Sequence, residues 1–207
     1  MRITNRLLAL TILSLAVAAC GGSSINAVVG GGSAQLQAPG AEAEAASGPI
    51  SFPEGAVITA GHDGTLVRVA CGATLSDAAS TGGDPEAGIV DFDLTDGTQL
   101  RRRQGTTFDL IGGVAHIKSG AVLSRLVVFH ATSFLEVRTD NGNGIDVHVI
   151  TQGDQLKVEV VKGRVLLNTT GATEKNLLFV TLEGGETSIA KPGEAPQKNA
   201  TDWFDTE

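Results

Sequence analysis

Residues 145–165, IDVHVITQGDQLKVEVVKGRV, decide the fold class of this chain. Apolar and polar residues alternate in both halves of the stretch. The apolar set is Ile145, Val147, Val149, Leu156, Val158 and Val160, and the polar set is Asp146, His148, Lys157 and Glu159. Successive side chains of an extended chain point to opposite faces, so each half predicts a strand with one buried face.

The same period of two continues in both directions from this stretch. From about residue 50 onward, roughly ten short strands at 8–12 residue spacing are separated by turns rich in Gly, Asn and Asp. Asp96-Gly97, after the alternating residues 91–94, is a strong β-hairpin signal. We therefore predict an all-β fold, a single antiparallel-rich β-sandwich or roll over residues 50–199. Residues 72–88 are expected to form an exposed loop.

Composition excludes several classes of protein. The 207 residues include 15 Lys and Arg against 23 Asp and Glu, a formal charge of −8, which argues against a nucleic-acid partner. Two cysteines cannot build a disulfide framework or a four-cysteine zinc site. The apolar share of 42% argues against a wholly disordered chain, and the length suits about one domain.

The amino terminus is typical of a secreted protein. Arg2 and Arg6 precede an apolar run over residues 7–19, which is too short to span a bilayer and predicts a signal peptide over residues 1–19. The run ends in LAVAAC at Cys20, which resembles the lipobox of bacterial lipoproteins. That resemblance implies cleavage before Cys20 and acylation of its thiol. The alternative is an ordinary signal peptide whose cleavage site happens to precede a cysteine.

Cleavage would change the charge and the fate of the cysteines. The mature chain would carry 13 cationic and 23 acidic residues, a net −10. Cys71 would be the only thiol left, and we expect it to be buried and inert rather than reactive. Residues 20–49 are rich in Gly, Ser and Ala and are predicted to be a flexible tether with a reach of about 30 Å.

Five short motifs between residues 91 and 194 occur in an order similar to that of the FecR domain, the periplasmic part of the FecR family of sigma-factor regulators. They are LTDGTQL at residues 94–100, GGVAHI at 112–117, SFLEVRT at 133–139, VEVVKGRV at 158–165 and LEGGE at 182–186. The resemblance implies a FecR-like β domain over residues 50–199, with its core at 91–194, in an envelope compartment.

The chain also departs from that family. Full FecR regulators have a cytoplasmic sigma-factor segment and a membrane helix before this domain, whereas here a signal peptide precedes it, so we expect no direct anti-sigma activity. The family's Gly-Thr-x-Phe element is not clear near residues 143–150. No functional residue is therefore transferred from the family.

Signals for catalysis or metal binding are few. The four histidines, His62, His116, His130 and His148, are spread over separate predicted strands or turns and lack the paired spacing of a zinc motif. Asp140–Asp146 offers oxygen ligands, yet its acids are not at the alternate positions of an EF-type calcium loop, and a hairpin turn explains its Asn-Gly units. We expect no catalytic, cofactor or metal site and no enzyme activity.

Two features are candidates for an interaction surface. Arg101, Arg102 and Arg103 form the one cationic run, with Arg101 and Arg103 on one face of a strand and Arg102 on the other; a charged strand at a sheet edge is the alternative. Trp203 and Phe204 lie in the acidic tail, residues 200–207.

Together these features predict a lipid-anchored envelope protein in the outer membrane, facing the periplasm. Gly21 and Gly22 follow Cys20, and neither is the Asp that retains typical lipoproteins in the inner membrane, so the lipoprotein resemblance implies the outer membrane. Its partners would be the membrane, through acyl chains on Cys20, and an envelope protein, with a role in interaction, sensing or scaffolding. A glycan- or small-molecule-binding lipoprotein is the alternative function.

Overall fold

The protein is an all-β structure, as the alternating sequence predicts. The computed structural model describes residues 24–70, 89–120, 126–137, 144–170 and 177–199. These residues form sixteen strands and their turns, more strands than the ten or so expected, and none of them lies in a helix able to span a membrane. The strands are β1 (Ser24–Gln37), β2 (Glu44–Pro53), β3 (Val57–Ala60), β4 (Thr65–Ala70), β5 (Ile89–Leu94), β6 (Gln99–Arg102), β7 (Thr107–Ile111), β8 (Val114–Ser119), β9 (Leu126–His130), β10 (Ser133–Val137), β11 (Ile145–Gln152), β12 (Gln155–Lys162), β13 (Arg164–Thr170), β14 (Leu177–Glu183), β15 (Thr187–Ala190) and β16 (Gln197–Lys198).

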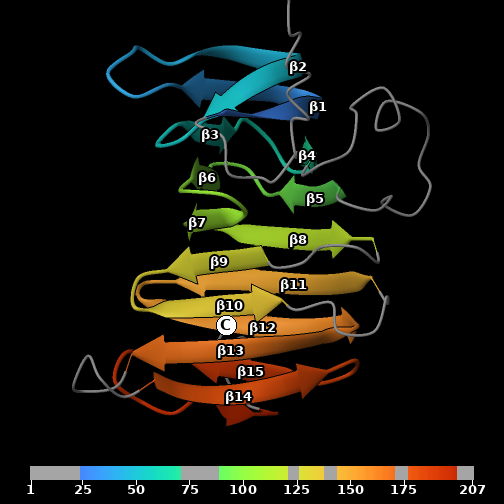
Figure 1. Ribbon diagram of the computed structural model, residues 1–207, viewed down its shortest axis with the longest axis vertical. Helices are drawn as coiled ribbons and strands as arrows, with labels where there is room; N and C mark the ends of the chain where they lie inside the picture. Colours follow the sequence, from blue (N-terminus) through green and yellow to red (C-terminus); the bar gives the residue numbers. More distant parts are fainter. Residues whose placement is uncertain (1–23, 71–88, 121–125, 138–143, 171–176, 200–207) are drawn as a thin grey trace, which may run out of the picture.

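A hairpin of β1 and β2 covers one end of the molecule, and β1 connects the two sheets described below (Figure 1). One edge of β1 pairs with β2 along most of its length. The other edge is divided, since residues 26–30 pair with β4 and residues 34–37 pair with β3. The register shift between Val29 and Ala34 contains the glycine run 30–32. β1 is therefore shared by two sheets, one that continues through β4 and one that continues through β3.

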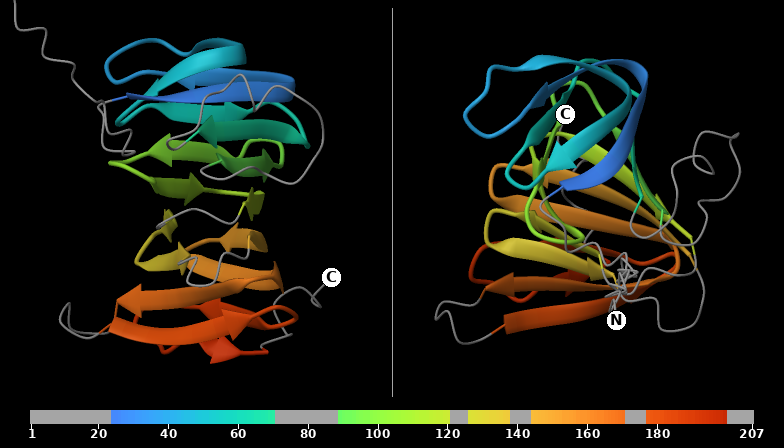
Figure 2. Two further views of the ribbon diagram at one scale, coloured as in Figure 1. Left: turned by 45° about the vertical axis from the view of Figure 1, so that its right-hand side comes forward. Right: turned by 45° about the horizontal axis from the view of Figure 1, so that its top comes forward.

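We call these two sheets wing I and wing II. Wing I has the order β4-β5-β8-β11-β12-β15-β16, and wing II has the order β3-β6-β7-β9-β10-β13-β14. The wings form two layers below the hairpin, and β12 of wing I contacts β10, β13 and β14 of wing II (Figure 2). Among the described pairings, only β7 with β9 is parallel. The arrangement confirms the prediction of an antiparallel-rich β fold.

Where the structure describes the connection, the chain crosses between the wings through short turns that contain glycine. The Asp96-Gly97 turn joins β5 of wing I to β6 of wing II, so the hairpin predicted there is wrong: β5 pairs with β4 and β8, and β6 pairs with β3 and β7. Gly112 and Gly113, with φ of 69° and 71°, form the next crossing, from β7 to β8. A two-residue turn dictates a reversal of the chain, but it does not dictate that the two flanking strands pair.

The core lies between the wings and under the hairpin. In β11 the residues at 145, 147 and 149 are buried and those at 146, 148 and 150 are partly exposed, as the alternation predicts. Near the hairpin, Phe108 packs against Phe92 and Phe52, with ring centroids 5.0 Å and 6.3 Å apart. These side chains are fully buried and fill the space where the two wings meet β1.

The prediction of a flexible tether over residues 20–49 is wrong from residue 24 onward. Residues 24–37 are β1, the strand shared by both wings, and Ala27, Val29 and Ala34 are almost fully buried. The buried residues of this strand, Ile25, Ala27 and Val29 on one side and Ala34 and Leu36 on the other, are separated by the glycine run 30–32, which interrupts the period of two. The β domain therefore begins at residue 24 rather than 50, and β2 occupies residues 44–53.

Three further predictions fall outside the described residues. They are the signal peptide with Cys20, the loop at residues 72–88 together with Cys71, and the tail at residues 200–207.

Candidate functional site

The outward face of wing I carries ionisable side chains in adjacent positions on five strands. We call this set the ionic face: Arg68 on β4, Asp91 and Asp93 on β5, His116 and Lys118 on β8, Asp146 and His148 on β11, and Lys157 and Glu159 on β12. The residues between them point inward, and Phe92, Ile117, Val147 and Val158 are fully buried. The alternation that builds the core thus also builds this polar outer face.

Strand register places the side chains of the ionic face in two rows across the wing. In one row Asp93 is opposite His116, His116 is opposite His148, and His148 is opposite Glu159. In the other row Arg68, Asp91, Lys118 and Asp146 are opposite one another in turn. Residues directly opposite on antiparallel strands have Cβ atoms about 4.5–5.5 Å apart, close enough for side chains to interact.

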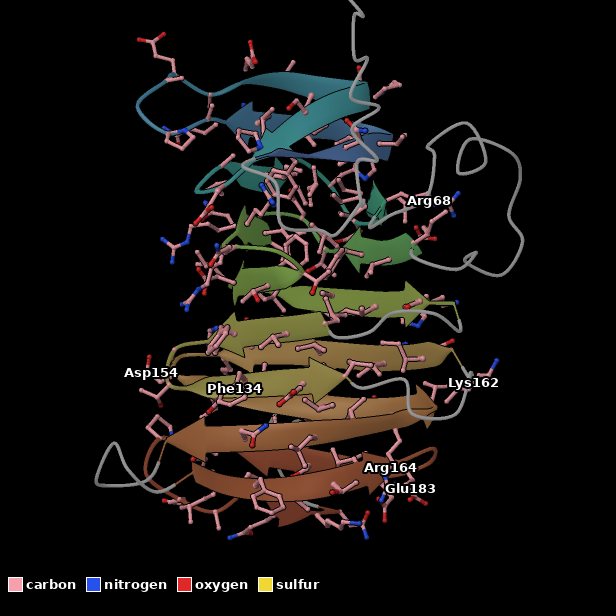
Figure 3. The ribbon with its side chains drawn as sticks, viewed as in Figure 1. Arg68, Phe134, Asp154, Lys162, Arg164 and Glu183 are labelled. Carbon is pink, nitrogen blue, oxygen red and sulfur yellow. The ribbon has the colours of Figure 1, made fainter. Side chains whose placement is uncertain are left out.

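At one end of these rows, at the Arg68 labelled in Figure 3, Arg68 and Asp91 form a two-point ion pair. Arg68 Nε donates to Asp91 Oδ1 at 2.6 Å, and a terminal nitrogen donates to Oδ2 at 2.7 Å. Both side chains are largely buried. The hydrogen bond to Asp91 raises the pKa of Arg68, against the opposing effect of its burial. This pair joins β4 to β5 through a fixed geometry.

At the centre of the ionic face, His116, Asp146 and His148 come together. His116 Nε2 donates a hydrogen bond to Asp146 Oδ1. The two imidazole rings are nearly perpendicular, with centroids 4.1 Å apart. One potential ligand atom from each of the three side chains lies within 4.8 Å of the other two. Two imidazoles and a carboxylate therefore converge on one partly exposed point.

The charges around Asp146 favour its ionised form. Partial burial raises the pKa of its carboxyl group, but the hydrogen bond from His116 and the charges of His116, Lys118 and His148 lower the pKa by more. The pKa of Asp146 is therefore below its ordinary value. Lys118 Nζ lies 3.6 Å from Asp146 Oδ2, so the two carboxylate oxygens face different partners.

A second carboxylate lies beside His148 on the next strand. Glu159 Oε2 is 3.7 Å from His148 Nδ1, and Glu159 Oε1 is 3.0 Å from Lys157 Nζ. The Lys157 side chain is only 9% exposed, because its stem lies along the sheet. Glu159 is thus held between a lysine and a histidine.

The sequence gives no direct indication of this cluster, and sequence analysis missed it. His148 does lie on the polar face of its strand, as its alternation with valines predicts. The sequence does not indicate that β8 pairs with β11, because β9 and β10 lie between them in the chain and belong to the other wing. The outward position of both histidines was the available signal. His62 and His130 lie elsewhere, and His130 interacts with the carbonyl oxygens of Leu110 and Gly153.

The arginine run at 101–103 is held largely by contacts within the fold. Arg101 Nε and Arg103 Nε each donate to the buried carboxylate of Asp109 at 2.7 Å. The guanidinium of Arg103 also lies 4.3 Å from the ring centre of Phe129, a cation–π contact. Arg101 and Arg103 share one face, as predicted, and about half of each side chain is exposed.

Arg102 points the other way, into the core. It is fully buried and donates to the carbonyl oxygen of Phe52 at 3.1 Å. Burial lowers its pKa, while the charge of Glu54 opposes that shift. The prediction that Arg102 belongs to an interaction surface is therefore wrong. The alternative of an edge strand is also wrong, because β6 pairs on both sides, with β3 and β7.

Wing II ends at β14, whose outward face is partly apolar. Phe179 is 64% exposed, the largest exposure of any large apolar side chain in the described ranges. Across the wing it is opposite Asn168, and Asn168 is opposite Phe134, which is labelled in Figure 3. Phe134 packs on Phe129 with ring centroids 5.0 Å apart. Arg164 and Glu183 form an exposed ion pair at the other end of β13 and β14.

The remaining candidates cannot be placed in this fold. Cys20, Trp203 and Phe204 lie outside the described residues, as do residues 140–143 of the candidate calcium loop. Comparison of the chain with protein-family models, with curated proteins and with solved structures found no match.

Proposed function

We propose that this protein is a lipid-anchored lipoprotein of the outer membrane that faces the periplasm and binds an envelope protein through a non-catalytic, FecR-like β domain. The anchoring part rests on the lipobox-like segment that ends at Cys20. The interaction part rests on one observation, the end strand β14 with its exposed Phe179.

The position of β1 refines the anchoring proposal. Only Gly21, Gly22 and Ser23 separate Cys20 from β1, which begins at Ser24. A fully extended chain advances at most about 3.6 Å per residue, so acyl chains on Cys20 would hold the start of β1 within about 15 Å of the membrane. The proposed lipoprotein therefore has a short anchor that keeps the hairpin end of the domain close to the bilayer.

The anchoring proposal is tested by replacing Cys20. The Cys20→Ser variant should keep its signal peptide, since the acylated thiol is the expected substrate for cleavage, and should therefore be lost from the outer-membrane fraction. Cys71→Ser is the matched control and should fractionate like the wild type. Equal amounts of wild type and Cys20→Ser in the outer-membrane fraction, or an unmodified Cys20 in the mass of the amino-terminal peptide, would contradict lipidation.

The interaction proposal follows from the pairing of β14. Among the described pairings β14 is bonded only to β13, so its outer edge presents backbone N–H and C=O groups that can accept another strand. Phe179 supplies an apolar side chain beside this edge. Strand addition uses such main-chain bonds for affinity and side-chain contacts for specificity. The proposed partner is thus an envelope protein that adds one strand to wing II.

Photo-crosslinking from two positions tests this surface. A photoreactive phenylalanine at position 179 should form one discrete adduct in intact cells. The same residue at position 161, where Val161 is 57% exposed on β12 of wing I, should not form that adduct. The captured protein, once purified, should bind the wild-type chain and lose at least about tenfold in affinity for Phe179→Asp. Adducts only with a second copy of this chain, or equal adducts from both positions, would contradict the proposal.

A further inference from the structure

We propose that His116, Asp146 and His148 bind one divalent transition-metal ion, with Zn²⁺ as the expected occupant, on the outward face of wing I. The proposal is independent of lipidation and of the β14 edge. It rests on the convergence of three potential ligand atoms within 4.8 Å of one another.

The ligand set suits zinc and its neighbours in the first transition row. Neutral imidazole and carboxylate are ordinary zinc ligands, at about 2.0–2.2 Å from the ion. Imidazole also suits Cu²⁺ and Ni²⁺, whereas Mg²⁺ and Ca²⁺ prefer sites made of oxygen alone. The two-histidine, one-carboxylate composition therefore selects transition metals over the hard divalent cations.

The present separations require only small side-chain movements. Tetrahedral ligands at zinc distances are about 3.4 Å apart, somewhat less than the 4.8 Å limit that encloses the three atoms. His116 and His148 are directly opposite on paired strands, and Asp146 is two residues from His148 on the same face. The backbone under the site is thus a regular antiparallel pair, and rotations of side chains suffice to close the site.

Neighbouring charged groups support the three ligands from outside. Glu159 lies 3.7 Å from Nδ1 of His148, the position from which a carboxylate orients a metal-bound imidazole. Lys118 lies near Asp146 Oδ2, while Oδ1 faces His116. The oxygen that faces His116 is therefore the one directed toward the proposed ion.

Exposure of the three side chains gives the ion both an entry route and a free coordination position. His116 and Asp146 are 28% and 24% exposed, and His148 is 41% exposed. Zinc sites with three protein ligands usually keep a fourth position for water or an external ligand, whereas closed structural sites use four protein ligands. The proposed ion would hold β8 to β11 and present one exchangeable position at the surface.

Calorimetric titration of the tag-free full chain, purified in detergent and stripped with a chelator, tests the site. Zn²⁺ should bind with a stoichiometry of one, and Mg²⁺ should not compete. His116→Ala and His148→Ala should each weaken Zn²⁺ binding at least about tenfold, a change of the size seen for key groups around metal sites. His62→Ala is the matched control and should keep the wild-type affinity, since His62 lies outside the cluster.

A conservative variant and a spectroscopic probe keep the test decisive if an alanine variant fails to fold. Asp146→Asn preserves the shape of the side chain and should also weaken Zn²⁺ binding at least about tenfold while the circular dichroism spectrum stays that of the wild type. Co²⁺ should give the visible absorption of a four-coordinate site in the wild type and lose it in Asp146→Asn. Wild-type affinity in folded Asp146→Asn, or no Zn²⁺ binding by the wild type, overturns the proposal.

Discussion

Asp109 shows how a single acidic residue organises the cationic run. Its carboxylate is almost fully buried and accepts hydrogen bonds from Arg101 and Arg103, which share it from one face of the strand. Both arginines keep about half of their side chains in water, so solvent screens part of their charge. The carboxylate has no such exposure and depends on the two guanidinium groups for its hydrogen bonds.

We expect Asp109→Asn to lower the free energy of unfolding by about 1.5–3 kcal/mol, because the variant loses charge-assisted hydrogen bonds at a buried position. Urea denaturation measures the change. The control is Arg164→Ala, which removes the ion pair with Glu183, where both side chains are more than half exposed and the atoms are 3.6 Å apart. That change should cost at most about 1 kcal/mol. Equal losses in both variants would contradict the role given to Asp109.

At the scale of the element, β13 shows that the face on which a side chain lies decides how much that side chain contributes to the free energy of unfolding. Leu167 points between the wings and is fully buried, whereas its neighbour Leu166 points outward and is partly exposed. The two leucines are chemically identical and lie on the same strand. They differ only in the face to which the side chain points.

We therefore expect a large difference between two matched variants of β13. Leu167→Ala should lower the free energy of unfolding by about 2–5 kcal/mol, since it leaves a cavity in the core. Leu166→Ala should cost well under half of that, because water can occupy the vacated surface. Chemical denaturation of both variants gives the comparison, and a larger loss for Leu166→Ala would mean that the strand faces are assigned the wrong way round.

The turn from β14 to β15 is tied to β16 by Glu186. Its carboxylate accepts hydrogen bonds from Lys198 Nζ and from the backbone N–H of Glu183, all at 2.9 Å. The bond from Lys198 is the main cause that lowers the pKa of Glu186 below its ordinary value of 4.5. A lowered pKa means that the ionised form contributes stability above the ordinary pKa and that this contribution is lost as pH falls through the lowered value.

We expect the pKa of Glu186, followed by carbon NMR of its carboxyl group, to rise toward 4.5 in Lys198→Met. The loss of stability at pH below 4.5 should be correspondingly smaller in Glu186→Gln than in the wild type. Because the carboxylate is partly exposed, added salt should reduce both effects. An unchanged pKa in Lys198→Met would show that Lys198 is not the cause.

At the scale of the whole molecule, the two wings depend on the hairpin of β1 and β2. Between its pairing with β4, which ends at Gly30, and its pairing with β3, which begins at Ala34, β1 passes through residues 31–33. Gly31 has a φ of 79°, and a Cβ there would overlap the carbonyl oxygen of Gly64. Gly30 has open space around the position of a Cβ. The fold therefore requires glycine at position 31 but has room for a larger side chain at position 30.

We predict that Gly31→Ala lowers the free energy of unfolding by about 1–3 kcal/mol or more, since strain in the left-handed region adds to the overlap with Gly64. Gly30→Ala should change it by less than about 1 kcal/mol. Thermal and urea unfolding should show one transition in each variant, because both wings share β1. Separate transitions for the two wings, or equal effects of the two variants, would contradict a joining role for this strand.

The metal-ligand cluster illustrates what could be predicted from the sequence and what could not. Alternation in residues 145–149 places Asp146 and His148 on one outward face, and this prediction is confirmed. The approach of His116 depends on β8 pairing with β11, across two strands that belong to the other wing. A periodic pattern carries information about faces, because it is local, but none about which distant strand becomes the neighbour.

The sequence by itself determined the fold class, the inward and outward faces of its regularly alternating strands and the lipobox-like segment, since each depends on residues that are near one another in the chain. Only the tertiary structure decided that residues 24–37 form the shared strand, that Asp96-Gly97 crosses between wings and that His116 meets His148. These features follow from long-range strand pairing, in which backbone hydrogen bonds are the same for every sequence and the choice of partner is made by packing of the whole core.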